Sequence, residues 1–156
     1  MIKFILPVLI GGSVGLVGCS STNSVSKVTV PVVADQSQLL VNELKKGLSL
    51  YFGNNSATVE DKYDIYLTAA SQFLKKDMGY VLVLQGFTDS SGGSATNKRI
   101  SLERANAVRN QMIREYGANP SQIIASGLGS AQPIASNATS EGRAKNRRVT
   151  ATLRLR

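Results

Sequence analysis

The chain has 156 residues, and its 18 lysine and arginine residues against 10 aspartate and glutamate residues give a formal net charge of +8. It contains no histidine and no tryptophan, and its single cysteine is Cys19. These absences exclude a disulfide within the chain, a metal site built on His or Cys, and catalysis by Ser-His-Asp or Cys-His groups. The positive charge favours an acidic partner, for which nucleic acid, anionic lipid and an acidic cell-wall polymer all qualify.

The N-terminal segment predicts export and lipidation. Lys3 is followed by residues 4–17, which carry no charge and are shorter than the roughly 20 residues of a membrane span. The segment ends in Leu16-Val17-Gly18-Cys19, which resembles the lipobox of bacterial lipoproteins. The resemblance implies cleavage before Cys19, acyl chains such as palmitate on this residue, and an outer-membrane anchor with the domain facing the periplasm. An ordinary secretory signal with a chance cysteine is the alternative.

The predicted organisation has three parts: a lipoprotein signal peptide at 1–18, a lipidated N-terminus and tether at 19–38, and a folded domain at 39–156. The tether is rich in Ser, Thr, Val and Asn and contains Pro31, a composition typical of a flexible connection. A short strand at 28–33 is the alternative. Because an exported chain does not meet nucleic acid, peptidoglycan and lipopolysaccharide remain as the acidic partners.

Strands and helices alternate in the predicted domain. The expected elements are, in chain order, a brief helix at 39–46, a strand at 48–52, a helix at 60–76, a strand at 80–84, a helix at 97–116, a strand at 121–126, a polar loop at 137–145 and a strand at 148–153. After the tether, the order β-α-β-α-β-β predicts an α/β two-layer sandwich with helices packed on a mixed sheet.

Helical spacing also predicts which side chains of the two long helices face the core. For the first helix they are Tyr63, Tyr66, Ala70 and Phe73. For the second helix they are Leu102, Ala105, Val108, Met112 and Tyr116.

The most informative stretch lies between residues 86 and 149. It contains Gly-Phe-Thr-Asp at 86–89, Asn97, Ile-Ser-Leu-Glu-Arg-Ala at 100–105, Gly-Leu-Gly at 127–129, Pro133, Asn137 and Glu-Gly-Arg-Ala-Lys-Asn-Arg-Arg-Val at 141–149. In this order and spacing, these motifs resemble the OmpA-like C-terminal peptidoglycan-binding domain over about residues 47–156. Together with the cysteine motif, the layout is similar to that of the peptidoglycan-associated lipoproteins.

The resemblance implies a site for the diaminopimelate of peptidoglycan stem peptides. This amino acid carries an ammonium and a carboxylate on one carbon, so its recognition needs an anion and a cation a few ångströms apart. We expect Asp89, in a loop after a buried strand, to accept from the ammonium, and Arg104, on the following helix, to donate to the carboxylate. The further candidates for peptidoglycan binding are Thr88, Asn97, Asn55 with its neighbour Asn54, and Arg147.

Taken singly, these residues have structural explanations. An Asp after a strand is commonly a turn residue, and an Arg on a helix such as Arg104 is commonly solvated or paired with a nearby acid. Only one of Arg147 and Arg148 is expected to reach the site, because successive strand residues face opposite sides, and the family pattern implies Arg147. Phe87 stands where the family commonly has His, and its ring neither titrates nor hydrogen-bonds.

The sequence therefore predicts a non-enzymatic lipoprotein that binds peptidoglycan non-covalently and links the outer membrane to the wall, without a metal or cofactor. A glycosidase would need two carboxylates flanking a bond, and Asp89 has no evident acidic mate. A tether keeps the domain at a high effective concentration near the wall, so modest affinity suffices. The alternative is an envelope interaction or signalling module that acts through a protein partner in motility, secretion or stress signalling.

Overall fold

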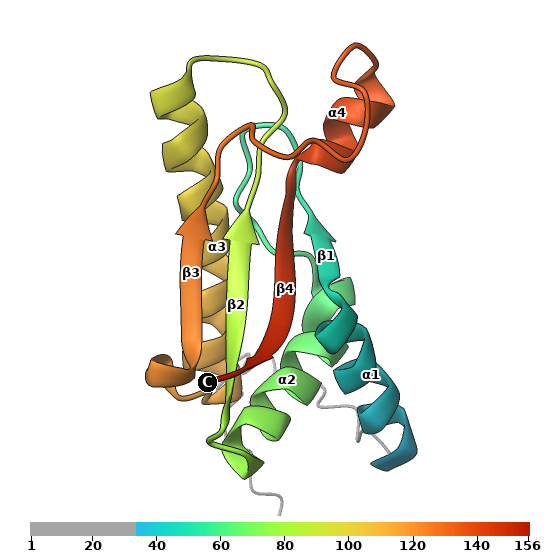
Figure 1. Cartoon of the computed structure of the whole chain (residues 1–156), viewed down its shortest axis with the longest axis vertical. Helices are drawn as coiled ribbons and strands as arrows, with labels where there is room; N and C mark the ends of the chain where they lie inside the picture. Colours follow the sequence, from blue (N-terminus) through green and yellow to red (C-terminus); the bar gives the residue numbers. More distant parts are fainter. Residues whose placement is uncertain (1–33) are drawn as a thin grey trace, which may run out of the picture.

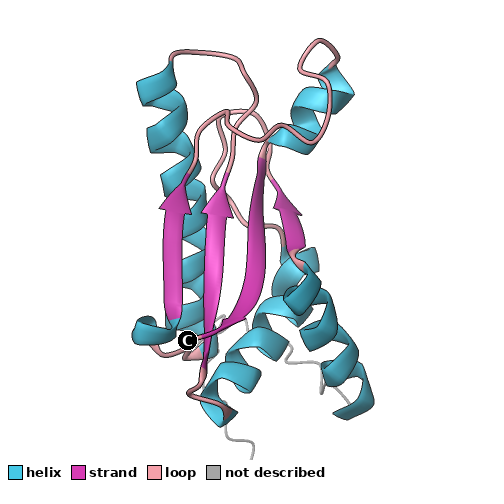
Figure 2. Ribbon diagram, viewed as in Figure 1, coloured by secondary structure: helices cyan, strands magenta, loops and turns pink. Residues whose placement is uncertain are grey.

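A computed structural model describes residues 34–156. The predicted signal peptide, Cys19 and the alternative strand at 28–33 lie outside the described residues. In chain order the elements are α1 (Ala34–Lys46), β1 (Leu48–Tyr51), α2 (Asp64–Lys76), β2 (Tyr80–Gly86), α3 (Ser94–Tyr116), β3 (Ile123–Gly127), α4 (Ser140–Asn146) and β4 (Arg148–Leu155), with 3₁₀ turns at Asp61–Tyr63 and Pro120–Gln122 (Figures 1 and 2). The predicted α/β class with helices on a mixed sheet is confirmed.

The four strands form one sheet in the order β1-β4-β2-β3. β2 and β3 are parallel and are joined through α3, whereas β4 is antiparallel to both β1 and β2. The register places Leu84 opposite Ala151 on one side and opposite Ala125 on the other. The last strand is therefore inserted between the first two, so that β1, β2 and β3 all end at the edge where β4 begins.

The core lies between one face of the sheet and the helices α1, α2 and α3, and α3 runs behind β2 and β3 in Figure 1. The most deeply buried apolar side chains alternate along the strands and recur at helical spacing: Leu44, Leu50, Leu67, Leu74, Leu82, Leu84, Val108, Met112, Val149 and Ala151. Complete burial of each large aliphatic side chain stabilises the fold by about 1.5–3 kcal/mol. This packing holds the strand ends in place beneath the loops above them.

Three helix boundaries differ from the predicted ones. α1 begins at Ala34 rather than 39, α2 begins at Asp64 rather than 60, and α3 begins at Ser94 rather than 97. The predicted polar loop at 137–145 contains the short helix α4, whose N-cap Thr139 accepts a hydrogen bond from the Gly142 N–H at 3.0 Å. A two-turn polar helix has no apolar stripe, so only the capping threonine indicates it in the sequence.

The predicted inner stripes are partly confirmed. In α2 and the turn before it, Tyr63 and Ala70 are buried and Phe73 packs against the core, whereas Tyr66 is only half-buried and the fully buried Leu67 and Leu74 were missed. In α3, Leu102 is 40% exposed, and its neighbour Ser101 is fully buried instead. The start of α3 lies too close to the sheet to admit a leucine at that point.

Two glycines permit this close approach. A Cβ atom at Gly86, the last residue of β2, would overlap the carbonyl oxygen of Ser101, and one at Gly127 would crowd the backbone N–H of Leu102. The hydroxyl of Ser101 fills the narrow space, because it accepts a hydrogen bond from the Gly129 N–H at 2.9 Å. The first turns of α3 are thereby pressed against the ends of β2 and β3.

We expect Gly86→Ala to lower the free energy of unfolding by about 1–3 kcal/mol, because the added methyl group overpacks the contact between β2 and α3. Urea denaturation measures the change. Gly53→Ala is the matched control, since its nearest contact, Ser56 Cβ at 3.6 Å, is an ordinary van der Waals distance. Its stability should change by less than about 1 kcal/mol. Equal effects at the two glycines would contradict the close-packing explanation.

Candidate functional site

A pocket of about 280 Å³ opens at the sheet edge where β2 ends. Its walls are the β1–α2 loop, the β2–α3 loop, the first turns of α3 and the residue before β4. It is lined by Asn54, Asn55, Thr88, Asp89, Ser91, Gly92, Thr96, Asn97, Ile100, Arg104 and Arg147. All six predicted peptidoglycan-binding residues are among them, so segments distant in sequence converge here; their role in binding stays a prediction.

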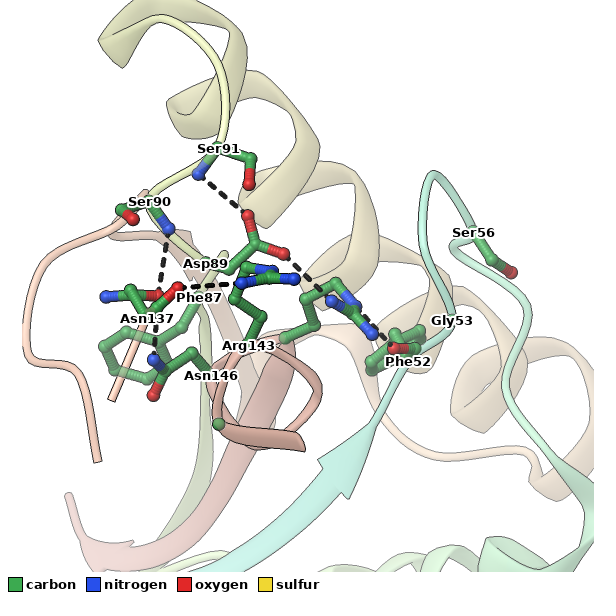
Figure 3. Close-up of polar contacts among 12 residues, drawn as sticks. Phe52, Gly53, Ser56, Phe87, Asp89, Ser90, Ser91, Asn137, Arg143 and Asn146 are labelled. Atoms are coloured by element: carbon green, nitrogen blue, oxygen red, sulfur yellow. Dashed lines mark hydrogen bonds and ion pairs between the residues drawn. The ribbon is translucent and has the colours of Figure 1, made fainter. Parts of the chain in front are cut away.

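Asp89 is the carboxylate of the pocket and is only 6% exposed. Its Oδ2 accepts a hydrogen bond from Arg147 Nη1 at 3.0 Å, and its Oδ1 accepts one from the backbone N–H of Ser91 at 2.9 Å (Figure 3). Burial by itself raises the pKa of Asp89, but the hydrogen bonds from Arg147 and Ser91 outweigh it and hold the pKa below its ordinary value. Asp89 is therefore an anion at neutral pH.

Arg104 lies on α3 and is 1% exposed. It donates to three backbone carbonyls: Nε to Ser56 at 2.9 Å, Nη2 to Gly53 at 3.0 Å and Nη1 to Phe87 at 3.3 Å. A guanidinium has five N–H groups, so two remain beyond these three bonds. Burial, followed by the nearby charge of Arg147, lowers the pKa of Arg104, and Asp89 partly opposes the shift.

Arg147 is the cation that pairs directly with Asp89. The sequence instead predicted Arg104 as the main cation of the site and Arg147 as a further candidate. The Arg147 Nε also donates to the carbonyl of Phe52 at 3.3 Å. As predicted, Arg148 faces elsewhere: it stacks on the Phe87 ring at 3.9 Å and donates to the Gln132 carbonyl at 3.1 Å.

Phe87, the residue that departs from the family pattern, is 2% exposed and is not part of the pocket wall. Its ring stacks against the guanidinium of Arg148, and its backbone carbonyl accepts the hydrogen bond from Arg104. The Phe87 side chain therefore contacts Arg148 and contributes no donor or acceptor to the pocket wall.

Thr88 and Asn97 add polar groups to the pocket wall. The Thr88 hydroxyl is buried and has no hydrogen-bond partner among the described residues. The side-chain amide of Asn97 reaches the carbonyls of Asp89 and Gly92 only at 3.5 Å each. Asn55 is exposed at the rim and has a left-handed backbone, with φ of 50°. The pocket wall therefore has hydrogen-bonding groups that lack a close partner within the protein and could bind a ligand.

A bracing network that sequence reasoning only partly found holds the pocket loops together. The Asn137 side-chain oxygen accepts from Ser90 N at 3.1 Å and from Asn146 Nδ2 at 2.9 Å, and its carbonyl accepts from Arg143 Nη1 at 3.0 Å (Figure 3). Asn146, which is fully buried at the centre of this network, was not among the predicted site residues. The sequence indicated Asn146 only through its position inside the motif at 141–149. The network ties the loop before β4 to the loop after β2.

The chemistry of the site follows from its charges. Two arginines face one carboxylate, and Asp89 is the only acidic residue among those lining the pocket. This arrangement suits a ligand with a carboxylate and an ammonium, and lacks the second carboxylate of a glycosidase. Residues 34–156 contain no group of His, Cys, Asp or Glu that would hold a metal ion. None of the helices in this range is both long and apolar enough to cross a bilayer.

Comparison with known proteins gives consistent matches. The sequence pattern described as the OmpA family matches residues 51–147, a range that contains every residue lining the pocket. Outer membrane protein Omp38 of Acinetobacter baumannii is 34% identical over 148 residues, which are 95% of this chain and 41% of that protein. Probable lipoprotein YiaD of Escherichia coli is 42% identical over 102 residues, 65% of this chain and 46% of that protein. The chain thus spans less than half the length of these relatives.

Among solved structures, the peptidoglycan-associated lipoprotein from Burkholderia pseudomallei has the same fold, with a TM-score of 0.64 and 32% sequence identity. The match covers 68% of this chain and 89% of that one. It therefore includes most of the described domain.

The lowered pKa of Asp89 predicts a pH dependence of stability. The Asp89 contribution is fully present above the pKa of the unfolded carboxyl, about 3.9, and is lost as the pH falls through the lower folded pKa. At pH 7, Asp89→Asn should cost about 1–3 kcal/mol of unfolding free energy, and this difference should shrink towards pH 2. Urea denaturation across this range measures both quantities.

Glu103→Gln is the matched control, because Glu103 forms an exposed ion pair with Arg99 at 2.6 Å. Its effect at pH 7 should stay below about 1 kcal/mol. A pH-independent cost for Asp89→Asn would show that its carboxylate charge does not contribute to stability.

Proposed function

The chain belongs to the OmpA family, and we propose that its domain binds peptidoglycan non-covalently at the bacterial outer membrane. The observation that carries the proposal is the pocket in which Asp89, Arg104 and Arg147 meet. A relative with the same fold is named a peptidoglycan-associated lipoprotein, and another relative is an outer membrane protein. Both names favour the cell envelope as the place of action.

The ligand that fits these charges is the diaminopimelate of the stem peptide. Its ammonium would bind Asp89, whose carboxylate has lone pairs beyond the two bonds from Arg147 and Ser91. Its carboxylate would bind the two further N–H groups of Arg104. The unpartnered Thr88 hydroxyl supplies another hydrogen bond.

The affinity expected for one stem peptide is modest. Each charge-assisted hydrogen bond contributes about 1.5–3 kcal/mol net, and ordering of the ligand opposes this gain. The wall presents many copies of the same stem, and a chain held next to it rebinds rapidly. Attachment to the wall thus needs no strong single site.

The organisation proposed for the chain is a signal peptide at 1–18, a lipid anchor on Cys19 and a connecting segment that leads to α1. Two relatives named as lipoproteins, YiaD and the Burkholderia protein, support the anchor. The fourteen residues between Cys19 and Ala34 span at most roughly 50 Å. That reach would allow an anchored domain to meet a wall layer close to the membrane.

We expect Asp89→Asn to reduce co-sedimentation of the full chain with purified diaminopimelate-type peptidoglycan by about tenfold or more, because the ligand ammonium loses its counter-charge. Glu103→Gln should leave co-sedimentation unchanged. Circular dichroism of each variant checks that the fold is intact. Undiminished sedimentation of Asp89→Asn would overturn the site assignment, and a protein partner retained by this variant in envelope extracts would favour the interaction-module alternative.

Soluble stem peptides that carry lysine in place of diaminopimelate test the role of Arg104. Lysine keeps the ammonium but lacks the adjacent carboxylate, so the guanidinium would lose its ligand. We expect a soluble lysine stem tripeptide to compete for the site about 10- to 100-fold less well than the diaminopimelate tripeptide. Equal competition by the two peptides would disprove carboxylate recognition while leaving wall binding itself intact.

The lipid anchor has a separate test. Cys19→Ser should abolish incorporation of radiolabelled palmitate in expressing cells, because the thiol that carries the diacylglycerol is removed and processing stops. Ser20→Ala, the neighbouring substitution, should retain the label. Labelling of the Cys19→Ser chain would disprove acylation at this residue.

A further inference from the structure

The end of the domain opposite the pocket carries cations around two exposed apolar side chains. In Figure 1 this is the lower end, where α2 ends, β2 begins and the C-terminus lies, whereas the loops of the pocket are at the upper end. We call this surface the basic pole and define it by six exposed residues: Lys45, Lys75, Lys76, Met78, Leu155 and Arg156. None of them lines the pocket.

Contacts between the elements bring these residues together. The N–H of Arg156 donates to the carbonyl of Gly79 at 2.8 Å, and Leu155 pairs with Tyr80 across the sheet. The Lys45 ammonium lies 5.5 Å from the Tyr80 ring centroid, which places the end of α1 beside the start of β2. The Lys75 ammonium donates to the carbonyl of Tyr116 at 2.8 Å, at the end of α3.

The charge of the pole is strongly one-sided. The six residues that define the pole include four cations and no acid, and the neighbouring Asp77 already accepts a hydrogen bond at its Oδ1 from the Gly79 N–H at 2.9 Å. Arg154, next to Leu155, adds a further exposed cation. Such a surface attracts an anionic partner through a field that extends over about one Debye length.

The apolar side chains distinguish among anionic partners. Met78 is 53% exposed and Leu155 is 73% exposed. In the chain, Met78 follows Lys76 by two residues and Leu155 lies between Arg154 and Arg156. A sugar polymer offers little to such side chains, whereas the boundary between the headgroups and acyl chains of a bilayer accepts them. Lysine and arginine side chains around an apolar tip are the arrangement that suits a membrane surface carrying negative headgroups.

We propose that the basic pole binds the surface of a bilayer containing anionic phospholipid. The cations contact the phosphate groups, while Met78 and Leu155 enter the headgroup region. This function is separate from wall binding, because it uses the opposite end of the domain and none of the residues lining the pocket.

Helix ends explain only part of this surface. Lysines in the last turn stabilise the partial negative charge at the C-terminal ends of α1 and α2. That effect accounts for neither Arg154 and Arg156, which lie on the last strand and beyond it, nor the exposure of Met78 and Leu155. A membrane surface accounts for the cations and the apolar side chains together.

The test measures partition of the full chain, with Cys19→Ser to prevent acylation, onto unilamellar vesicles. One set contains phosphatidylethanolamine and phosphatidylglycerol at 3:1, and the other contains phosphatidylcholine alone. The readout is the ratio of the two partition constants, because the apolar N-terminal segment is shared by all variants and largely cancels. The pole variant is Lys76→Glu with Arg156→Glu, since both side chains are exposed and neither forms a hydrogen bond or ion pair with another residue in the range 34–156.

The matched control is Lys98→Glu with Lys145→Glu, which makes the same change in net charge at exposed positions near the opposite end. Each basic residue near an anionic surface strengthens binding by about fivefold, so loss of the two cations should lower the ratio by about 30-fold, and repulsion of the two added carboxylates should lower it further. The control should lose less than about threefold, and peptidoglycan co-sedimentation of the pole variant should be unchanged.

Two results would overturn the proposal. Equal losses in the pole variant and the control would show that net charge alone attracts the chain to the vesicles. A wild-type ratio near one, with binding seen only to lipopolysaccharide micelles, would replace the phospholipid surface with a different anionic partner. Neither result would bear on the pocket, whose test uses Asp89→Asn and peptidoglycan.

Discussion

The buried guanidinium of Arg104 is the interaction on which the arrangement of the pocket depends. A cation taken out of water destabilises a fold unless its donors are satisfied, and here three backbone carbonyls satisfy them. Two of these carbonyls, of Gly53 and Ser56, belong to the β1–α2 loop, and the third, of Phe87, follows β2. One side chain on α3 therefore holds two loops in position. The close approach of α3 to the sheet at Gly86 brings Arg104 near enough to reach these carbonyls.

The same arrangement leaves the pocket with one more positive than negative side chain. Burial and the nearby charge of Arg147 lower the pKa of Arg104, and Asp89, which pairs directly with Arg147, opposes this shift only in part. A ligand carboxylate would relieve this repulsion, while its ammonium would complete the acceptors of Asp89. Because backbone bonds already hold these side chains, a ligand needs to order few protein groups on binding. The charge imbalance is thus a source of affinity and not only a cost to stability.

Local patterns predicted most of the fold and of the site, and long-range packing decided the rest. Apolar patterns located all four strands: alternation at 48–52 and 148–153, a continuous apolar run at 80–84, and two adjacent isoleucines at 123–124. The ordered motifs of the OmpA-like resemblance placed Asp89, Asn97 and Arg104 in one site. The direct pairing of Arg147 with Asp89 depends on the loop that Asn137 and Asn146 brace, which residue spacing does not reveal. Helical periodicity predicted that Leu102 faces the core. The periodicity does not show that the sheet packs directly against the helix backbone at Gly86 and Gly127, where a leucine side chain does not fit.

The two ends of the sheet have different chemistry, and the strands connect them. β2 runs for seven residues from the basic pole to the pocket, a rise of roughly 23 Å. In the proposed arrangement, a membrane contact at the pole would point the pocket away from the bilayer and towards the wall. The anchor alone would leave the orientation of the domain free, so that only some of its encounters with the wall would be productive. A weak second contact at the pole would therefore raise the effective concentration of a correctly oriented pocket without adding any contact to the ligand.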